Sequence, residues 1–161
     1  MYGERKKYSN ISRIKMDTTK VTEKQWLIDS PKRITDYNKV IPVLEIYPCV
    51  QSEGSRQGRP TIAIRTTGCT HRCWFGEGGW CDSWYTSIHP EKGKFTFNDI
   101  VKAYDENPHI REMMLTGGSP TMQPDLVNEL THFAYSRGIF ITIETEGSHF
   151  IKTITHWAYL S

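Results

Sequence analysis

Three cysteines, Cys69, Cys73 and Cys81, lie within thirteen residues of a loop that follows a short apolar segment. Three thiolates on one loop can hold a metal ion or an iron–sulfur cluster and leave one coordination position open. A purely structural site is normally closed, whereas an open position lets a substrate or cofactor bind the metal. The spacing therefore predicts a reactive centre, and a structural zinc site completed by His71 is the alternative.

Two polar turns follow other apolar segments of the chain. Residues 112–116 run into Thr116-Gly117-Gly118-Ser119-Pro120, and residues 139–145 run into Glu144-Thr145-Glu146-Gly147. Glycine suits a turn that a ligand approaches closely, because a side chain would block the approach. Either turn alone could be an ordinary strand end, and it indicates a functional site only because the cysteine loop is present in the same chain.

The elements that position these turns alternate between strand and helix. Apolar and β-branched runs predict strands over residues 43–47, 61–66, 112–116 and 139–145. Thr96 and Asp99 resemble a capping box that begins one helix, and Asn107 precedes the proline that ends it. A second helix is predicted from Pro124 to the stop at Gly138.

This order of elements predicts a single α/β domain with a parallel sheet and right-handed crossovers. Ligands of such sheets bind at the carboxyl ends of the strands, so the cysteine loop and both turns should converge on one rim. We place this domain at residues 40–161 and treat residues 1–39 as a basic N-terminal extension. Its final segment, 156–161, reads as the beginning of a strand, so we expect the domain to be incomplete at its C-terminus.

Composition favours a cytoplasmic protein that does not bind nucleic acid directly. Hydrophobic residues make up 37% of the 161 residues, and the sequence contains no apolar run long enough for a membrane helix or a signal peptide. Residues 1–40 carry ten Lys and Arg against five Asp and Glu, while the rest of the chain is slightly acidic. The four cysteines are better read as ligands or reduced thiols than as disulfides.

The cysteines and the Gly-Gly turn together resemble the radical S-adenosylmethionine (SAM) superfamily. In that superfamily three cysteines ligate a [4Fe–4S] cluster, and SAM chelates the fourth iron. The usual C-x3-C-x2-C spacing is lengthened here to C-x3-C-x7-C. The resemblance implies a parallel-sheet partial (β/α) barrel.

Within the superfamily, residues 41–161 resemble the 7-carboxy-7-deazaguanine synthase family. The similar segments are Glu45-Ile46-Tyr47 with Gln51-Ser52-Glu53-Gly54, Gly58-Arg59-Pro60, Arg65 to Cys69, Cys81-Asp82-Ser83, Leu115 to Pro120, Glu144 to Gly147, and Trp157 to Ser161. Ser52 replaces a glycine of that family, and Ser83 replaces a threonine. The last segment is cut at its serine.

The resemblance assigns expected roles to individual residues. It implies that Cys69, Cys73 and Cys81 hold the cluster and that Asp82 and Ser83 bind Mg²⁺. SAM is expected at Gly117, Gly118 and Ser161. The substrate is expected at Val50, Gln51, Ser52, Glu53, Arg65 and Thr116, with Arg65 paired to its carboxylate. Glu144 is the candidate catalytic residue.

The resemblance implies conversion of 6-carboxy-5,6,7,8-tetrahydropterin to 7-carboxy-7-deazaguanine with loss of ammonia. This lyase reaction belongs to queuosine biosynthesis, a tRNA modification pathway. The expected partners are the pterin and an electron donor such as flavodoxin or ferredoxin, and the resemblance is compatible with a homodimer. Two alternatives stay open: the activating enzyme of anaerobic ribonucleotide reductase, and a non-catalytic zinc- or cluster-binding module.

Overall fold

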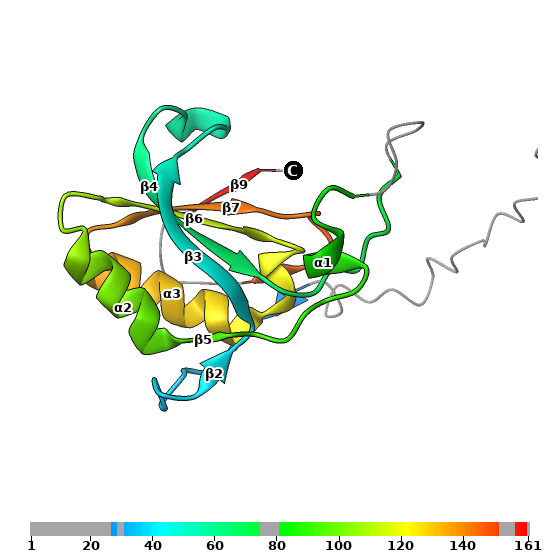
Figure 1. Cartoon of the computed structure of the whole chain (residues 1–161), viewed down its shortest axis with the longest axis horizontal. Coiled ribbons are helices and arrows are strands. Elements are labelled where there is room, and N and C mark those ends of the chain that lie inside the picture. The colour runs from blue at the N-terminus through cyan, green and yellow to red at the C-terminus, as the bar shows by residue number, and fades with distance from the viewer. Residues whose placement is uncertain (1–26, 29–30, 75–80, 152–156, 161) are drawn as a thin grey trace, which may run out of the picture.

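The computed structural model describes residues 27–28, 31–74, 81–151 and 157–160. Its centre is a five-stranded sheet in the order β3-β4-β6-β7-β9 (Figure 1). These strands span Val43–Val50, Pro60–Thr66, Glu112–Gly117, Phe140–Glu144 and Trp157–Leu160. Strands β4, β6, β7 and β9 are parallel, which confirms the predicted parallel α/β sheet.

Strand β3 departs from that prediction because it pairs with β4 in antiparallel fashion at the edge of the sheet. The physical reason is the connection: residues 51–59 join β3 to β4, and a parallel pair needs a longer crossover, usually through a helix. Pro48 lies inside β3 and is paired with Ile62, so it does not end the strand. An edge strand tolerates this proline because one of its sides lacks a neighbouring strand.

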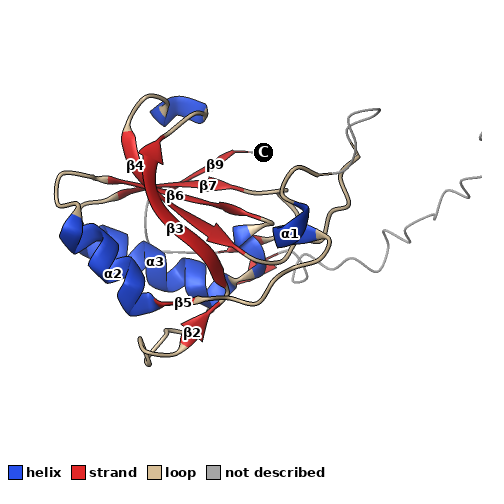
Figure 2. Cartoon of the chain, in the orientation of Figure 1, coloured by secondary structure: helices blue, strands red, loops and turns tan. Residues whose placement is uncertain are grey.

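Two helices, α2 (Phe97–Glu106) and α3 (Pro124–Arg137), cover one face of the sheet (Figure 2). The predicted capping box is confirmed, since Thr96 accepts from the Asp99 amide and Asp99 accepts from the Thr96 amide. Pro124 begins α3, and Gly138 ends it with a φ of 63°. Such a left-handed conformation favours glycine.

The hydrophobic core lies between this helical layer and the sheet. Successive side chains of a strand point to opposite faces, so one residue in two can enter the core. The buried members on the strands include Ile62, Ile64, Met113, Leu115, Ile141 and Ile143, and those on the helices include Phe97, Ile100, Leu126 and Leu130. The alternate strand residues are therefore free to form a site on the other face.

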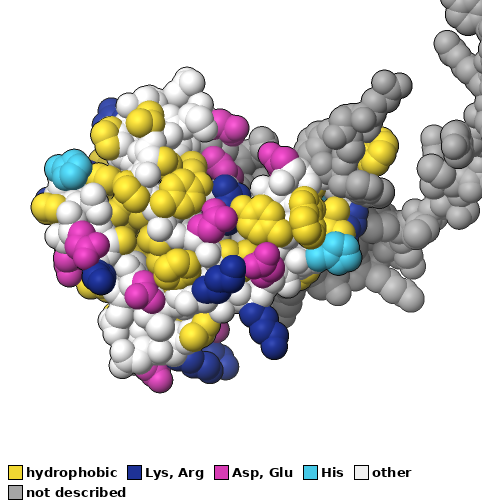
Figure 3. Space-filling view, viewed as in Figure 1, with side chains coloured by type: hydrophobic (Ala, Val, Ile, Leu, Met, Phe, Trp, Pro, Cys, Tyr) yellow, Lys and Arg dark blue, Asp and Glu magenta, His cyan; other side chains and the backbone are white. Residues whose placement is uncertain are grey.

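The shorter elements lie around this frame. They are β1 (Leu27–Ile28) paired with β8 (Phe150–Ile151), β2 (Val40–Ile41) paired with β5 (Phe95–Thr96), helix α1 (Trp84–Ser87), and single 3-10 turns at Gly54–Arg56 and Pro120–Met122. Within the part of the chain that the structure describes, no helix combines the length and apolar character needed to cross a membrane. On the face seen in Figure 3, acidic and basic side chains are interspersed among hydrophobic ones.

The segment before β2 is fastened to α3 through the carboxylate of Glu129. Arg33 donates to both carboxylate oxygens, at 2.6 and 2.9 Å, and the Tyr37 hydroxyl and the Ile34 amide also donate to them. The Glu129 side chain is only 1% exposed. Residues 31–39 thus contact the domain, while most of the predicted 1–39 extension lies outside the described residues and its boundary stays a prediction.

Burial raises the pKa of Glu129, but the hydrogen bonds from Arg33, Tyr37 and Ile34 outweigh burial and hold that pKa below its ordinary value of 4.5. The bonded carboxylate therefore stabilises the fold fully above the unfolded-state pKa. The stabilisation is lost as the pH falls through the lower folded-state pKa.

We expect Glu129→Gln to lower the free energy of unfolding by about 2 kcal/mol at neutral pH, because hydrogen bonds to a charged acceptor are lost. Urea denaturation from about pH 6 to about pH 3 should show this difference shrinking as the wild-type carboxylate is protonated. Glu106→Gln on the exposed side of α2 is the matched control, with little effect expected at any pH. A Glu129→Gln difference that did not change with pH would contradict the assignment.

Candidate active site

A cleft of about 600 Å³ lies on the sheet face opposite the helices. Its floor is formed by the alternate strand residues, namely Tyr47, Cys49, Arg65, Met114, Thr116 and Glu144. Its rim comes from the ends of strands: Val50, Ser52 and Glu53 after β3, the cysteine loop after β4, Gly117 and Gly118 after β6, and Thr145 and Glu146 after β7. The structure therefore confirms that the cysteine loop and both polar turns converge on one site.

Cys69, Cys73 and Cys81 all line this cleft, and each is half-buried with a free thiol. The Cys81 amide donates to the Cys73 carbonyl at 3.1 Å, so two of the three cysteines are joined through their backbones. At the start of the loop, the Gly68 amide donates to the Thr86 carbonyl and the Ser119 amide donates to the Gly68 carbonyl, both at 2.7 Å. The cysteine loop is thus held by backbone bonds to α1 and to the Gly-Gly turn.

The Gly-Gly turn packs directly on the chain that leads into the cysteine loop. A Cβ on Gly118 would lie 2.2 Å from the Gly68 oxygen, and a Cβ on Gly117 would lie 2.1 Å from the Thr66 oxygen. Gly117 also has a φ of 122°, a conformation that side chains disfavour. Close backbone packing therefore requires both glycines, whether or not a ligand also approaches them.

Arg65 lies at the centre of a cluster of polar side chains on the cleft floor. Its guanidinium donates to Glu45 at 2.8 Å, to the Tyr47 hydroxyl at 3.3 Å and to the Ser83 hydroxyl at 3.4 Å. Tyr85 donates to the other oxygen of Glu45 at 3.0 Å, so the partner of Arg65 is itself held in place. Among the described residues these bonds use three of the five N–H donors of Arg65, which leaves two for a ligand.

Thr116 and Glu144 form a second polar contact on the floor. The Thr116 hydroxyl donates to the Glu144 carboxylate at 2.6 Å, and both residues line the cleft. Cys49, to which the sequence assigned no role in the site, lines the cleft as well and is half-buried. Its alternation with Tyr47 along β3 was the signal that places it on this face.

Gln51 lies apart from the other predicted substrate residues, because it does not line the cleft. Its backbone N–H donates to Arg59 and its carbonyl accepts from Gly58, so both backbone groups are already bonded. The side chain is 2% exposed, and its Oε1 has no hydrogen-bond partner within the described residues. Ser161 lies outside the described residues.

Comparison with known proteins places this geometry in a family. The family model described as "Radical SAM superfamily" matches residues 63–158, more than half of the chain, from within β4 to within β9. The chain belongs to the radical SAM superfamily. Membership implies a [4Fe–4S] cluster and SAM as cofactors.

Curated relatives of this radical SAM protein carry the name 7-carboxy-7-deazaguanine synthase. The protein from Halobacterium salinarum is 35% identical over 108 residues, 67% of this chain and 40% of the relative. Those from Rhodopirellula baltica and Leptospira interrogans are 33% and 30% identical, over 66% and 73% of this chain and 38% and 54% of the relatives. The chain thus spans about half or less of the length of these relatives.

A solved structure shares the fold. The crystal structure of QueE from Escherichia coli matches with a TM-score of 0.57 and 23% sequence identity, over 73% of this chain and 57% of that chain. At this identity the match shows the fold alone, and it agrees with the expected radical SAM architecture.

The residues of this radical SAM protein fit a cluster by the chemistry of their donors. Three sulfur atoms face one cleft, and soft thiolates suit iron–sulfur chemistry. Burial raises the pKa of the Cys69 thiol, and the negative charges of Glu146, Cys73 and Cys81 raise it further. Iron would relieve this repulsion between thiolates. Within the described residues, no three His, Cys, Asp or Glu side chains are already gathered around a position for a single metal ion.

Anaerobic reconstitution with iron and sulfide should give a brown protein with about four irons per chain. Cys→Ala at position 69, 73 or 81 should abolish the visible absorption and the bound iron. Cys49→Ala is the matched control, because Cys49 lines the same cleft outside the cysteine loop and should keep both. One zinc and no iron per chain, measured by elemental analysis, would contradict the cluster.

Proposed function

We propose that this chain carries the core of an enzyme that converts 6-carboxy-5,6,7,8-tetrahydropterin to 7-carboxy-7-deazaguanine and ammonia. The product and ammonia together account for all atoms of the substrate, so the net reaction needs no oxidant. The names of the curated relatives support this reaction over the activation of anaerobic ribonucleotide reductase. The observation that carries the proposal is one cleft that is lined both by the three cysteines and by Arg65.

Arg65 is the proposed binding group for the substrate carboxylate. A carboxylate pairs best with two parallel N–H groups of a guanidinium, and two donors of Arg65 have no acceptor among the residues that the structure describes. Glu45, Tyr47 and Ser83 hold the guanidinium in place, so little side-chain entropy is lost on binding. Val50, Ser52 and Glu53 lie along the same cleft and would contact the pterin ring.

Thr116 and Glu144 would orient the substrate at the other side of the floor. Because the Thr116 hydroxyl donates to Glu144, its oxygen can still accept a hydrogen bond from a ring N–H. The Glu144 carboxylate could accept a further hydrogen bond from the substrate or from SAM.

The cofactors would take the other wall of the cleft. When bound, the cluster and SAM supply a 5′-deoxyadenosyl radical that abstracts hydrogen from the substrate. Gly117 and Gly118 present backbone without side chains on this wall. Asp82 and Ser83 line the cleft with a carboxylate and a hydroxyl, two oxygen donors that suit Mg²⁺ when a substrate supplies further oxygens.

A cytoplasmic location and an electron donor of the flavodoxin or ferredoxin type belong to the same proposal. The cluster needs thiols that stay reduced, which the cytoplasm provides, and the four described cysteines are free thiols.

The proposal is tested by supplying the reconstituted protein with SAM, dithionite and 6-carboxy-5,6,7,8-tetrahydropterin under anaerobic conditions. Mass spectrometry should detect 7-carboxy-7-deazaguanine, with 5′-deoxyadenosine as a trace of radical formation. Deoxyadenosine without the deazaguanine would contradict the proposed substrate and leave the radical SAM assignment intact. Protein lacking any of the three cluster cysteines is the negative control.

Arg65→Ala should weaken binding of the pterin at least tenfold and leave SAM binding within about twofold, because a charged hydrogen bond to a carboxylate is worth about 1.5–3 kcal/mol. Arg65→Lys should recover only part of the loss, since an ammonium cannot form the bidentate pair. Isothermal titration of the reconstituted protein with each ligand measures both effects. Equal weakening of pterin and SAM would show that Arg65 supports the cleft in general.

A further inference from the structure

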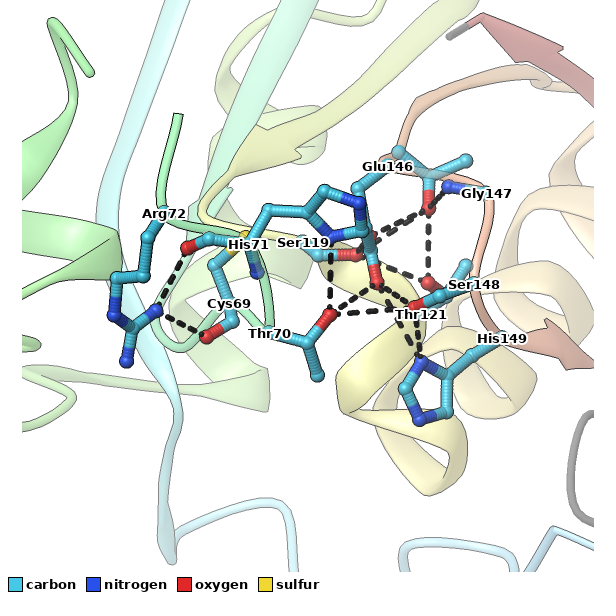
Figure 4. A network of polar contacts seen from close by, with 11 residues as sticks. Cys69, Thr70, His71, Arg72, Ser119, Thr121, Glu146, Gly147, Ser148 and His149 are labelled. Atoms are coloured by element: carbon cyan, nitrogen blue, oxygen red, sulfur yellow. Dashed lines mark hydrogen bonds and ion pairs between the residues drawn. The ribbon is translucent and has the colours of Figure 1, made fainter. Parts of the chain in front are cut away.

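Glu146, just after β7, is a buried carboxylate to which the cluster chemistry assigns no role. Its side chain is 8% exposed, and Figure 4 shows it among hydroxyl groups from several turns. It accepts hydrogen bonds from Thr70 at 3.1 Å, from Thr145 at 3.1 Å, and from Ser119 and Ser148. Four such bonds fill the acceptor positions of a carboxylate.

These donors come from the ends of three neighbouring strands. Thr70 is the residue after Cys69 in the cysteine loop, Ser119 directly follows Gly118, and Thr145 and Ser148 belong to the turn after β7. One side chain therefore joins the start of the cysteine loop to the Gly-Gly turn. The hydroxyl of Thr70 also lies 3.3 Å from Ser148, so the loop has a second contact with the same turn.

The carboxylate is charged at neutral pH. Burial raises its pKa, but hydrogen bonds from Ser148, its own backbone, Thr145 and Thr70 outweigh burial and lower that pKa below the ordinary value. His149 lies 3.5 Å away, close enough to form an ion pair when its ring is protonated. A fixed negative charge thus lies beside the loop of Cys69.

Glu146 lies in the segment Glu144-Thr145-Glu146-Gly147, in which the family resemblance assigned a role only to Glu144. Read as part of a strand, Glu146 would be an ordinary outward-facing side chain. The structure instead gives it a set of partners that depends on this chain's own Thr70, Ser119 and Ser148.

We propose that Glu146 is a positioning residue, which fixes the first turn of the cysteine loop against the Gly-Gly turn and places one negative charge near the cluster. The ordering role acts in the protein without iron and is independent of the pterin substrate. The charge has a second effect, because a nearby anion disfavours addition of an electron and lowers the reduction potential of a cluster.

Hydrogen–deuterium exchange of the iron-free protein tests the ordering role. In peptides that cover residues 67–74, Glu146→Gln and Thr70→Val should each raise the exchange rate about tenfold, because each loses a hydrogen bond to a charged acceptor. Glu106→Gln removes the same charge from an exposed position of α2 and should leave these peptides unchanged. Exchange in Glu146→Gln that matches Glu106→Gln would overturn the proposal.

A double-mutant cycle distinguishes the loss of the hydrogen bond from Thr70 to Glu146, here called the tether, from a general destabilisation of the loop. If the Thr70 hydroxyl acts through Glu146, the double variant should exchange little faster than either single variant, and fully additive effects would overturn the tether. Should Glu146→Gln fail to fold, Thr70→Val carries the test, because it keeps the side-chain shape and the buried charge.

In the reconstituted protein, Glu146→Gln should shift the midpoint potential of the cluster to a more positive value, while Thr70→Val should stay near wild type because it retains the carboxylate. Spectroelectrochemistry followed by electron paramagnetic resonance measures both. An unchanged potential in Glu146→Gln would overturn the electrostatic effect. If the wild type failed to take up iron, the cluster assignment would fail, and the exchange experiment would still decide the ordering role.

Discussion

The close approach of two backbones, the Gly-Gly turn after β6 and the chain leaving β4, is the constraint on which the site depends. The Gly118 amide donates to the Thr66 carbonyl at 3.2 Å, and the Ser119 amide donates to the Gly68 carbonyl at 2.7 Å. No Cβ fits between these segments. Because Cys69 follows Gly68 directly, this contact decides where the first sulfur lies relative to the cleft. Backbone hydrogen bonds of this kind do not depend on flexible side chains, so they fix the position at which the cysteine loop begins.

The two faces of the sheet divide the work of folding and chemistry. On one face Ile64, Leu115 and Ile143 enter the core against the helices. One residue further along each strand, Arg65, Thr116 and Glu144 face the cleft. The alternation of strand side chains thus allows the same three strands to bury apolar surface and to present polar groups. The apolar layer keeps these polar residues in register, because a slip by one residue would exchange the two faces.

Much of this arrangement could be predicted from the sequence, because the signals were local. Thr96 with Asp99, and Pro124 with Gly138, defined the helix ends, and the apolar runs defined β4, β6 and β7. The direction of β3 was missed, since only the loop length argued for an antiparallel pair. The position of Gln51 away from the cleft depends on the conformation of the loop that bonds it to Gly58 and Arg59, and the partners of Glu146 depend on contacts between segments far apart in the chain. One sequence without related sequences does not reveal such contacts.

The fastening of residues 33–37 to Glu129 has a consequence for where this fold can be cut. In a shortened chain that starts at residue 40, α3 would lose Arg33, Ile34 and Tyr37, the three partners of a carboxylate that is now 1% exposed. The ring of Tyr37, whose centroid lies 4.4 Å from that of Phe97 in a tilted arrangement, would be lost with them. The Glu129 carboxylate and the ring of Phe97 at the edge of the core would then both be exposed to solvent. Residues 33–37 are therefore an integral part of the helical layer, because they contact both α3 and α2.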